Sequence, residues 1–296
     1  MKDCRRLSRR LEADLLAAGE QIVRVPPKLM AHRRTAARTY GKSDPIDAPA
    51  AARAALREPD LPTAHLDGTS RDVRLLMDHR DDLVAERTHV INRLRWHLHE
   101  LDPALDAPAR SLTQPKHVCT VCDVLDGRIG IVARLARQLL AGCQELTTIV
   151  RELEAEITVL ISRLAPALLE IPGCGALTAA EVLGKTAGIA RFKSKSAYAR
   201  HNGTAPLPVW SGNRERHRLS RMGNRQLNVA LHRIAITPAH YHPEARAYLQ
   251  RRRDAGDTST EEIRALKRRL SDVVYRALRR DALLSAEQPV HLAATA

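Results

Sequence analysis

The sequence predicts a mainly α-helical protein with a small α/β fragment, a long antiparallel pair of helices and a helical C-terminal domain. Segments 69–101 and 131–164 carry apolar residues at helical spacing. Residues 3–25 combine a helix with a short β-branched run, which suits an α/β domain. We expect four parts: an N-terminal domain over 1–66, a coiled-coil arm over 67–166, a C-terminal helical domain over 167–283, and a disordered tail over 284–296.

The chain is strongly basic, which points to nucleic acid as a partner. Its 296 residues carry 48 Lys and Arg against 34 Asp and Glu, and only eight of the 48 are Lys. Arginine favours bidentate recognition of phosphate, and a net charge of +14 favours nucleic acid over an anionic membrane surface. The sequence shows no apolar run long enough to span a bilayer and no secretion signal. We expect a cytoplasmic, nucleoid-associated protein.

The numbers of aromatic and cysteine residues limit how the protein is expected to bind nucleic acid and whether it is expected to hold zinc or disulfides. Aromatic residues make up only 3% of the chain, so we expect nucleic acid to be held through its backbone rather than on base-stacking platforms. Five Cys without disulfide-framework spacing fit a reducing compartment. Cys119 and Cys122 beside His117 have the spacing of zinc ligands, but no second such pair exists, so two incidental thiols are favoured.

The N-terminal part is expected to hold a helix and one strand. The helix covers 3–18 and stops at Gly19, and the strand covers 21–25. Because a single strand is not a stable sheet, the chain is expected to begin in the middle of a fold.

Two acids lie at the start of the next predicted helix. Ser43 or Asp44 would cap this helix, and Pro45 suits its first turn. Asp44 and Asp47 are then close enough to converge, and their oxygens suit Mg²⁺, which would relieve their repulsion. The alternative is that Asp44 is a cap and Asp47 a surface acid favoured by the helix dipole.

The two long helices are predicted to pair with each other or across a dimer. Apolar residues recur at heptad-like spacing in both: Val84, Ile91 and Leu98 in the first, and Leu146, Val150, Leu153, Ile157, Leu160 and Leu164 in the second. Segment 103–130 between them contains proline and gives no clear prediction.

A glycine-containing turn follows the second long helix. Ile171–Glu181 has the hydrophobic-Gly-x-Gly-helix pattern of helix-hairpin-helix elements. Gly173 and Gly175 would expose backbone amides beside a helix N-terminus, forming a phosphate cradle that ignores base sequence. An ordinary hinge between helices is the alternative. The phosphate role is favoured because basic residues follow closely: Lys185, Arg191, Lys193 and Lys195.

A serine beside dense positive charge is the strongest catalytic candidate. Ser211 is expected in an exposed, flexible turn, and its neighbour Gly212 leaves room for phosphorus to approach. Ser-Gly is also a common turn dipeptide, so a solvated basic loop is the alternative. The residues expected to contact DNA phosphates around this serine are Arg214, Arg216, Arg218, Arg221, Asn224 and Arg225. Helices are expected to follow over 224–240 and 261–280.

Four motifs in order carry a resemblance to a known family. They are KSDPIDA at 42–48, IPGCGALTAA at 171–180, GTAP at 203–206 with Ser211-Gly212, and RMGNRQL at 221–227. With them, essentially the whole chain resembles DEDD-type transposases of the insertion sequence 110 family. This resemblance implies a RuvC-like domain of RNase H fold, a coiled-coil arm, and a C-terminal helical domain that carries a serine nucleophile.

The resemblance also assigns roles. Asp44 and Asp47 would be the last two of four acids that bind Mg²⁺, and Ser211 would be the nucleophile. Such enzymes move their element through a phosphoserine intermediate, guided by a structured RNA. They act on DNA as homo-oligomers, dimers or tetramers, whose acids and serine come from different protomers.

One departure from the family pattern affects the expected activity. No residue matches the first Asp, and Lys2 lies where the Glu is expected. We therefore expect an N-terminally truncated transposase with impaired catalysis. Two alternatives stay open: a non-catalytic nucleic-acid-binding protein, and a helix-hairpin-helix repair or resolution nuclease that forms no serine adduct.

Overall fold

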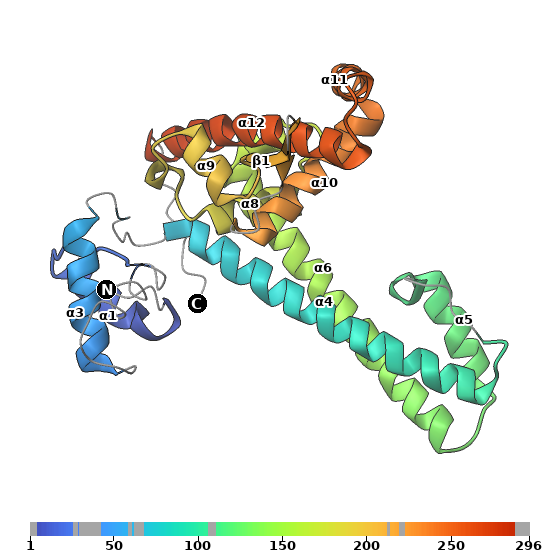
Figure 1. Ribbon diagram of the computed structural model, residues 1–296. Helices are drawn as coiled ribbons and strands as arrows, with labels where there is room; N and C mark the ends of the chain where they lie inside the picture. Colours follow the sequence, from blue (N-terminus) through green and yellow to red (C-terminus); the bar gives the residue numbers. More distant parts are fainter. Residues whose placement is uncertain are drawn as a thin grey trace. The chain divides into compact units, whose positions relative to one another are not determined.

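The computed structural model describes two compact units. They are Met1–Gly68 and Thr69–Ala296, and the residues described are 5–25, 29, 43–58, 61, 68–105, 111–211, 214–218 and 223–287. Within these residues the protein is mainly α-helical, with one two-stranded antiparallel sheet (Figure 1). None of the helices in the described ranges is long and apolar enough to cross a membrane.

The N-terminal unit contains two described helices, α1 (Arg5–Ala17) and α3 (Asp44–Arg57). The predicted stop of α1 is confirmed, because Gly19 has a φ of +82°, a left-handed conformation that favours glycine. The prediction of a strand over 21–25 is wrong. Val23 and Val25 each form an isolated β-bridge, and no continuous strand covers residues 21–25.

A small core and one ion pair hold the segment after α1. Val25 is fully buried and belongs to the same apolar cluster as Ala54 of α3. The Nε atom of Arg24 donates to Glu12 of α1 at 2.9 Å, and Glu12 is itself buried. This segment is therefore tied to α1 and α3, the two helices described in this unit.

Two long helices run antiparallel in the second unit (Figure 1). They are α4 (Gly68–Leu101) and α6 (Ile131–Leu164). Arg80 Nε donates to Glu154 at 2.9 Å, and Arg87 donates to Thr147 at 3.4 Å. From the first contact to the second, the residue number rises by seven on α4 and falls by seven on α6, as expected for two antiparallel helices. The helical periodicity seen in the sequence packs α4 against α6 of the same chain.

Residues 111–126, for which the sequence gave no clear prediction, pack against the C-terminal end of α4 and the N-terminal end of α6. A 3-10 turn, η1 (Ser111–Thr113), precedes α5 (Pro115–Asp126). Both pack into one apolar cluster with the ends of α4 and α6: Leu94, Leu98, Leu112, Val118, Val121, Leu125, Ala136 and Leu140. Cys119 is exposed and Cys122 half-buried on α5, and both are free thiols.

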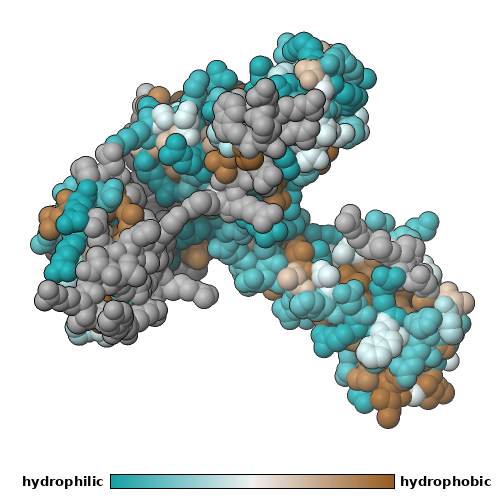
Figure 2. Space-filling model, in the orientation of Figure 1, coloured by the Kyte–Doolittle hydropathy of each residue, from teal (hydrophilic) through white to brown (hydrophobic). Residues whose placement is uncertain are grey.

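Large apolar side chains are exposed at this same end. Trp96 is 73% exposed, Ile129 99% and Ile131 69%. Figure 2 shows hydrophobic surface there on the view it presents. Exposed apolar residues gathered at one end of a long helical pair favour contact with another protein surface.

The rest of the second unit is a helical bundle with one hairpin. Its elements are α7 (Pro166–Leu169), α8 (Ala176–Thr186), η2 (Ile189–Arg191), α9 (Lys195–His201), β1 (Leu207–Ser211), β2 (Arg214–Arg218), α10 (Arg225–Tyr241), α11 (Pro243–Asp254) and α12 (Ser259–Glu287). The core joins α8, α10 and α12 with the ends of α4 and α6. Val182, Leu231 and Val274 are fully buried there.

The C-terminal helices match the sequence prediction in part. The helix expected over 224–240 is α10, and the helix expected over 261–280 is the central part of α12. However, α12 continues to Glu287, past position 284 where the tail was expected to begin. Residues 288–296 lie outside the described part of the chain.

Candidate active site

Ser211 lies in a β-hairpin rather than in the flexible turn that the sequence predicted. β1 and β2 pair antiparallel, with Leu207 opposite Arg218 and Ser211 opposite Arg214. Ser211 is therefore the last paired residue of β1, next to the connection to β2. An apolar run at 207–210 followed by a two-residue Gly-Asn connection fits a hairpin. The dense positive charge of residues 214–218 favoured a basic turn instead.

The register brings the predicted arginine positions to the serine. Val209 lies opposite Arg216, between the pairs named above. Because opposite residues share a face and faces alternate along a strand, positions 211, 214, 216 and 218 belong to one face of the hairpin. The side chains of 210–218 lie outside the described part of the structure, as does Arg221 altogether.

Two glycines meet at the root of the hairpin. A Cβ atom added to Gly223 would lie 2.3 Å from both the Cα and N atoms of Gly203. Gly203 has a φ of +74°, and Asn224 N donates to the carbonyl of His201 at 2.6 Å. The chain entering β1 and the chain leaving β2 therefore touch through their backbones.

Buried polar groups anchor this root to the helices. We name Asn202, Thr204, Asn228, Lys267 and Ser271 the root network. Asn202 is fully buried; its Nδ2 donates to Ser271 Oγ at 2.8 Å, and its Oδ1 accepts from Thr204 N at 3.1 Å and Oγ1 at 2.7 Å. Asn228 Nδ2 donates to the Asn202 carbonyl at 3.0 Å, and Lys267 Nζ donates to Asn228 Oδ1 at 2.6 Å. The network links the hairpin root to α10 and α12.

The buried Lys267 makes stability depend on pH. Burial, with a smaller contribution from Arg264, lowers the pKa of Lys267 from its usual 10.5 to about 8. Between these values the unfolded chain binds the proton that the folded chain releases, so stability rises with pH across this window. We expect the melting temperature of the wild type, relative to Lys267→Met, to rise between about pH 8 and 10.5.

Thermal unfolding followed by circular dichroism measures this difference. Lys195→Met is the matched control, because Lys195 is exposed at the start of α9. Its difference from wild type should stay constant over the same range. A constant difference for Lys267→Met as well would contradict the proposed cost of burying this ammonium.

The two glycines of the predicted phosphate cradle have different surroundings. Gly173 has a φ of +84°, and an added Cβ would lie 2.8 Å from Thr237 Cβ and 2.9 Å from the Ile234 carbonyl oxygen. Close packing on α10 therefore requires glycine at 173. Gly175 is the exposed N-cap of α8, and no atom lies within 4 Å of a Cβ added there. Only Gly175 lies on open surface.

Two of the predicted DNA contacts have structural partners. Lys185 Nζ lies 2.5 Å from Asp78 Oδ1, an ion pair that joins α8 to α4. Asn224 is the N-cap of α10, and its Oδ1 accepts from Leu227 N at 3.1 Å. In this conformation both side chains are engaged within the protein.

The remaining predicted contacts that can be placed are exposed. Lys193 and Lys195 lie on either side of Ser194, the N-cap of α9, whose Oγ accepts from Ala197 N at 3.2 Å. Arg225 is exposed at the first position of α10. These three side chains are exposed to solvent.

The two candidate acids share the first turn of α3. Ser43 occupies the N-cap position and Pro45 lies in the first turn, as predicted. Asp44 is exposed, whereas Asp47 is only 9% exposed. Among the described residues, no group of three or more His, Cys, Asp or Glu is arranged to hold a metal ion. These acids belong to the N-terminal unit and Ser211 to the other.

Comparison with known proteins covers both units. Residues 6–103 match the family model of the DEDD transposase domain of IS110 elements, and residues 165–250 match that of the transposase IS116/IS110/IS902 family. The chain belongs to the IS110 family of transposases. The first range contains both candidate acids, and the second contains Ser211 and the glycine turn.

Proteins of insertion elements show the same relation over most of their length. The uncharacterized 44.8 kDa protein of insertion element IS116 from Streptomyces clavuligerus is 27% identical over 96% of this chain and 83% of its own. The uncharacterized 42 kDa protein of IS900 from Mycobacterium paratuberculosis is 27% identical over 91% and 79%. The uncharacterized 43.6 kDa protein of IS110 from Streptomyces coelicolor is 28% identical over 77% and 68%.

Membership of the IS110 family indicates the general type of activity of this chain. The chain is a DNA transposase by descent and therefore a DNA-binding protein. Its DEDD domain indicates the use of divalent metal ions in general.

Proposed function

We propose that this transposase cleaves and joins DNA through Ser211, with Asp44 and Asp47 holding Mg²⁺ at the scissile phosphate. The observation that supports this most is the hairpin. Ser211 ends β1 directly opposite Arg214, and the root network fixes the hairpin to the helical core. A nucleophile reacts efficiently only when it is held in a defined position relative to its target.

The chemistry exchanges one phosphodiester bond for another. Ser211 Oγ gives up its proton and attacks phosphorus, so that an Oγ–P bond forms while a P–O bond to deoxyribose breaks and the departing deoxyribose oxygen takes up a proton to become a hydroxyl. A hydroxyl of a second DNA end then attacks the phosphoserine, and the serine leaves. Arg214, Arg216 and Arg218 would neutralise the non-bridging phosphate oxygens as charge develops on them.

Asp44 and Asp47 fit the requirements of Mg²⁺. This ion is held in many enzymes by one or two carboxylates together with substrate phosphates and water. Both acids lie in one turn at the positive end of α3, and Asp44 is open to solvent. When bound, the ion would supply positive charge to the phosphate.

Further DNA contacts are proposed on the open surface of the C-terminal unit. Gly175 would offer backbone amides at the start of α8, and the exposed side chains of Lys193, Lys195 and Arg225 would bind phosphates. Gly173 would shape the turn by packing on α10. We also propose that the turn and its flanking helices form a helix-hairpin-helix element.

The proposal also covers the fold of the N-terminal unit, the role of the long helices and the oligomeric state. The N-terminal unit would be part of a RuvC-like fold, and α4 with α6 would form a coiled-coil arm. The exposed apolar end of that arm favours a homo-oligomer, a dimer or tetramer that combines acids and serine from different protomers. The strong positive charge also suits a structured guide RNA as a second partner.

Metal dependence tests the proposed role of the acids. In a strand-joining assay with matched element ends, Asp44→Asn and Asp47→Asn should each lower the rate by about 100-fold or more. Both should raise the Mg²⁺ concentration needed for half-maximal rate, because each removes a ligand. DNA binding measured without metal should stay unchanged.

Asp14→Asn is the matched control. Asp14 is an exposed acid on α1 of the same unit. It should leave both the rate and the Mg²⁺ requirement at wild-type values. Wild-type Mg²⁺ requirements in the Asp44 and Asp47 variants would contradict metal binding by these acids.

A further inference from the structure

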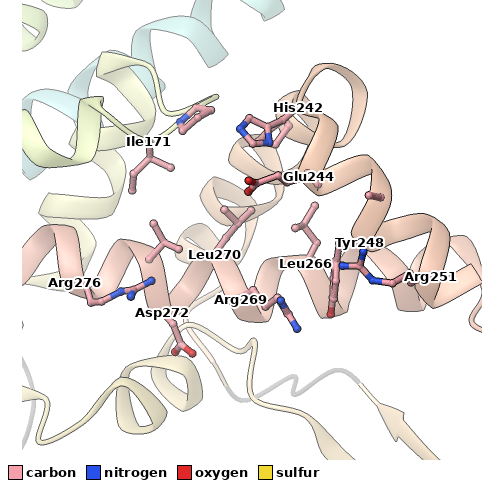
Figure 3. Close-up of a pocket in the computed structure, with 15 residues that line it drawn as sticks. Ile171, His242, Glu244, Tyr248, Arg251, Leu266, Arg269, Leu270, Asp272 and Arg276 are labelled. Carbon is pink, nitrogen blue, oxygen red and sulfur yellow. The ribbon is translucent and has the colours of Figure 1, made fainter.

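A cavity lies between α11 and α12, beside the end of α10 and the Ile171-Pro172 segment (Figure 3). Its volume of about 830 Å³ lies within the range of about 300–1,000 Å³ that is usual for small-ligand sites. Leu266, Leu270 and Val273 of α12 give it an apolar lining. Polar side chains from both helices also line it, so the cavity offers an apolar surface with charged groups around it.

Three of the cavity's polar side chains are arginines, which we name the rim arginines: Arg251, Arg269 and Arg276. Other arginines on these helices are paired with acids: Arg252 with Asp257, Arg253 with Glu262, and Arg268 with Asp272. In the described part of the chain, Arg251 and Arg276 have no carboxylate within ion-pair distance. Unpaired cations around a cavity favour an anionic ligand.

Tyr248 provides a flat surface beside the rim arginines. The Arg269 guanidinium lies 4.2 Å from the centroid of the Tyr248 ring, which stacks the two groups. A planar ligand placed against an aromatic ring and an arginine gains both stacking and cation–π attraction. The sequence had given no reason to expect such a stacking surface, because aromatic residues are so scarce.

We propose that this cavity binds one unpaired nucleotide of a nucleic-acid strand. Its base packs against Tyr248 and the apolar lining, and its phosphate contacts the rim arginines. The nucleotide is unpaired because a base can enter a cavity only when it is not held in a duplex stack. The chemistry is shared by single-stranded DNA and RNA, so the proposal concerns the nucleotide rather than its sugar.

The acidic and imidazole groups of the cavity are compatible with this ligand. Asp272 is paired with Arg268 at 2.5 Å, so its charge is compensated. Glu244 can accept a hydrogen bond from an amino group of a base. His242 lies on the same side as Glu244 in Figure 3 and offers a further polar contact. The site therefore favours a base that carries an exocyclic amine.

Binding of labelled oligonucleotides tests this site on the full chain. Fluorescence anisotropy is measured with single-stranded DNA, single-stranded RNA and blunt duplex DNA of about 12 nucleotides each. Arg251→Gln/Arg276→Gln should raise the Kd for a single strand about tenfold, and Tyr248→Leu should raise it to a similar extent. A loss confined to RNA or to DNA identifies which strand occupies the cavity, and a loss with both supports the shared chemistry.

Arg246→Gln/Arg279→Gln is the matched control, since it removes two exposed arginines from the same two helices outside the cavity. It should raise the single-strand Kd by only about twofold to threefold. On duplex DNA the two double variants should behave alike. All variants should melt within a few degrees of wild type.

Three results would overturn the inference: equal weakening by the two double variants, unchanged binding by Tyr248→Leu, or no single-strand binding by the wild type. The inference makes no use of Ser211. The anisotropy measurement requires no strand joining, so that this proposal and the catalytic one can fail separately.

Discussion

Ser211→Ala is expected to reduce strand joining by at least about 10³-fold, because removing a covalent nucleophile leaves only binding and electrostatic catalysis. The substitution removes only the side-chain hydroxyl at the last paired position of β1. We expect the register of the hairpin to stay unchanged. Binding to element-end DNA should be retained, since the proposed phosphate contacts come from other residues. Joining is measured with matched element ends in the presence of Mg²⁺.

Ser196→Ala serves as the control for this loss. Ser196 is an exposed serine on α9 of the same unit. Its replacement should leave joining within about twofold of wild type, because surface substitutions away from a site usually have small effects. Joining by Ser211→Ala at a rate near that of wild type would rule out the serine mechanism.

Gly223→Ala is expected to cause the largest loss of stability. The new Cβ would lie 2.3 Å from the Gly203 backbone, a clash that no rotamer change can relieve. Moving the backbone segments at Gly203 and Gly223 apart would strain the hydrogen bonds of the root network. We expect a loss of about 3 kcal/mol or more in the free energy of unfolding. For a unit of this size, the melting temperature should fall by about 6–12 °C.

Gly142→Ala provides a control of opposite sign. Gly142 lies within α6, and no atom lies within 4 Å of a Cβ added there. Alanine at an open position in a helix should stabilise the protein by about 0.5–1 kcal/mol. Calorimetry of both variants measures the difference. A Gly223→Ala protein as stable as wild type would show that the two backbones separate at little cost.

The sequence predicted the long helices well because their apolar spacing is regular. α4 and α6 follow the expected ranges, and Gly19 ends α1 as its missing side chain suggested. Segment 111–126 was missed because its helix is short, begins with proline, and buries its residues only against the ends of α4 and α6. Such a helix is decided by tertiary contacts.

The hairpin shows where local patterns gave too little information. The charges in Arg-Glu-Arg-His-Arg suit the flexible basic turn that the sequence predicts around Ser211, although the same segment fits a strand equally well. The Asn202-Gly203 and Gly223-Asn224 pairs were signals of a tight junction, but their contact depends on a separation of twenty residues. Long-range contacts of this kind are not visible in local spacing.

The candidate site was only partly predictable for the same reason. Spacing alone identified Asp44 and Asp47 as neighbours in one turn. It gave no sign that Lys185 is engaged by Asp78 from another helix, or that Gly173 faces α10. The rim arginines and Tyr248 come from α11 and α12, and only packing brings these helices together.

Mapping of a covalent protein–DNA adduct tests the central claim most directly. Element-end DNA that carries a nick, so that the second joining step cannot follow, is incubated with the full chain and Mg²⁺. The adduct is digested and its peptides are sequenced by mass spectrometry. The account predicts a nucleotide phosphate attached to Ser211, and no adduct with Ser211→Ala. Cleaved DNA without any serine adduct, or an adduct on another residue, would contradict it.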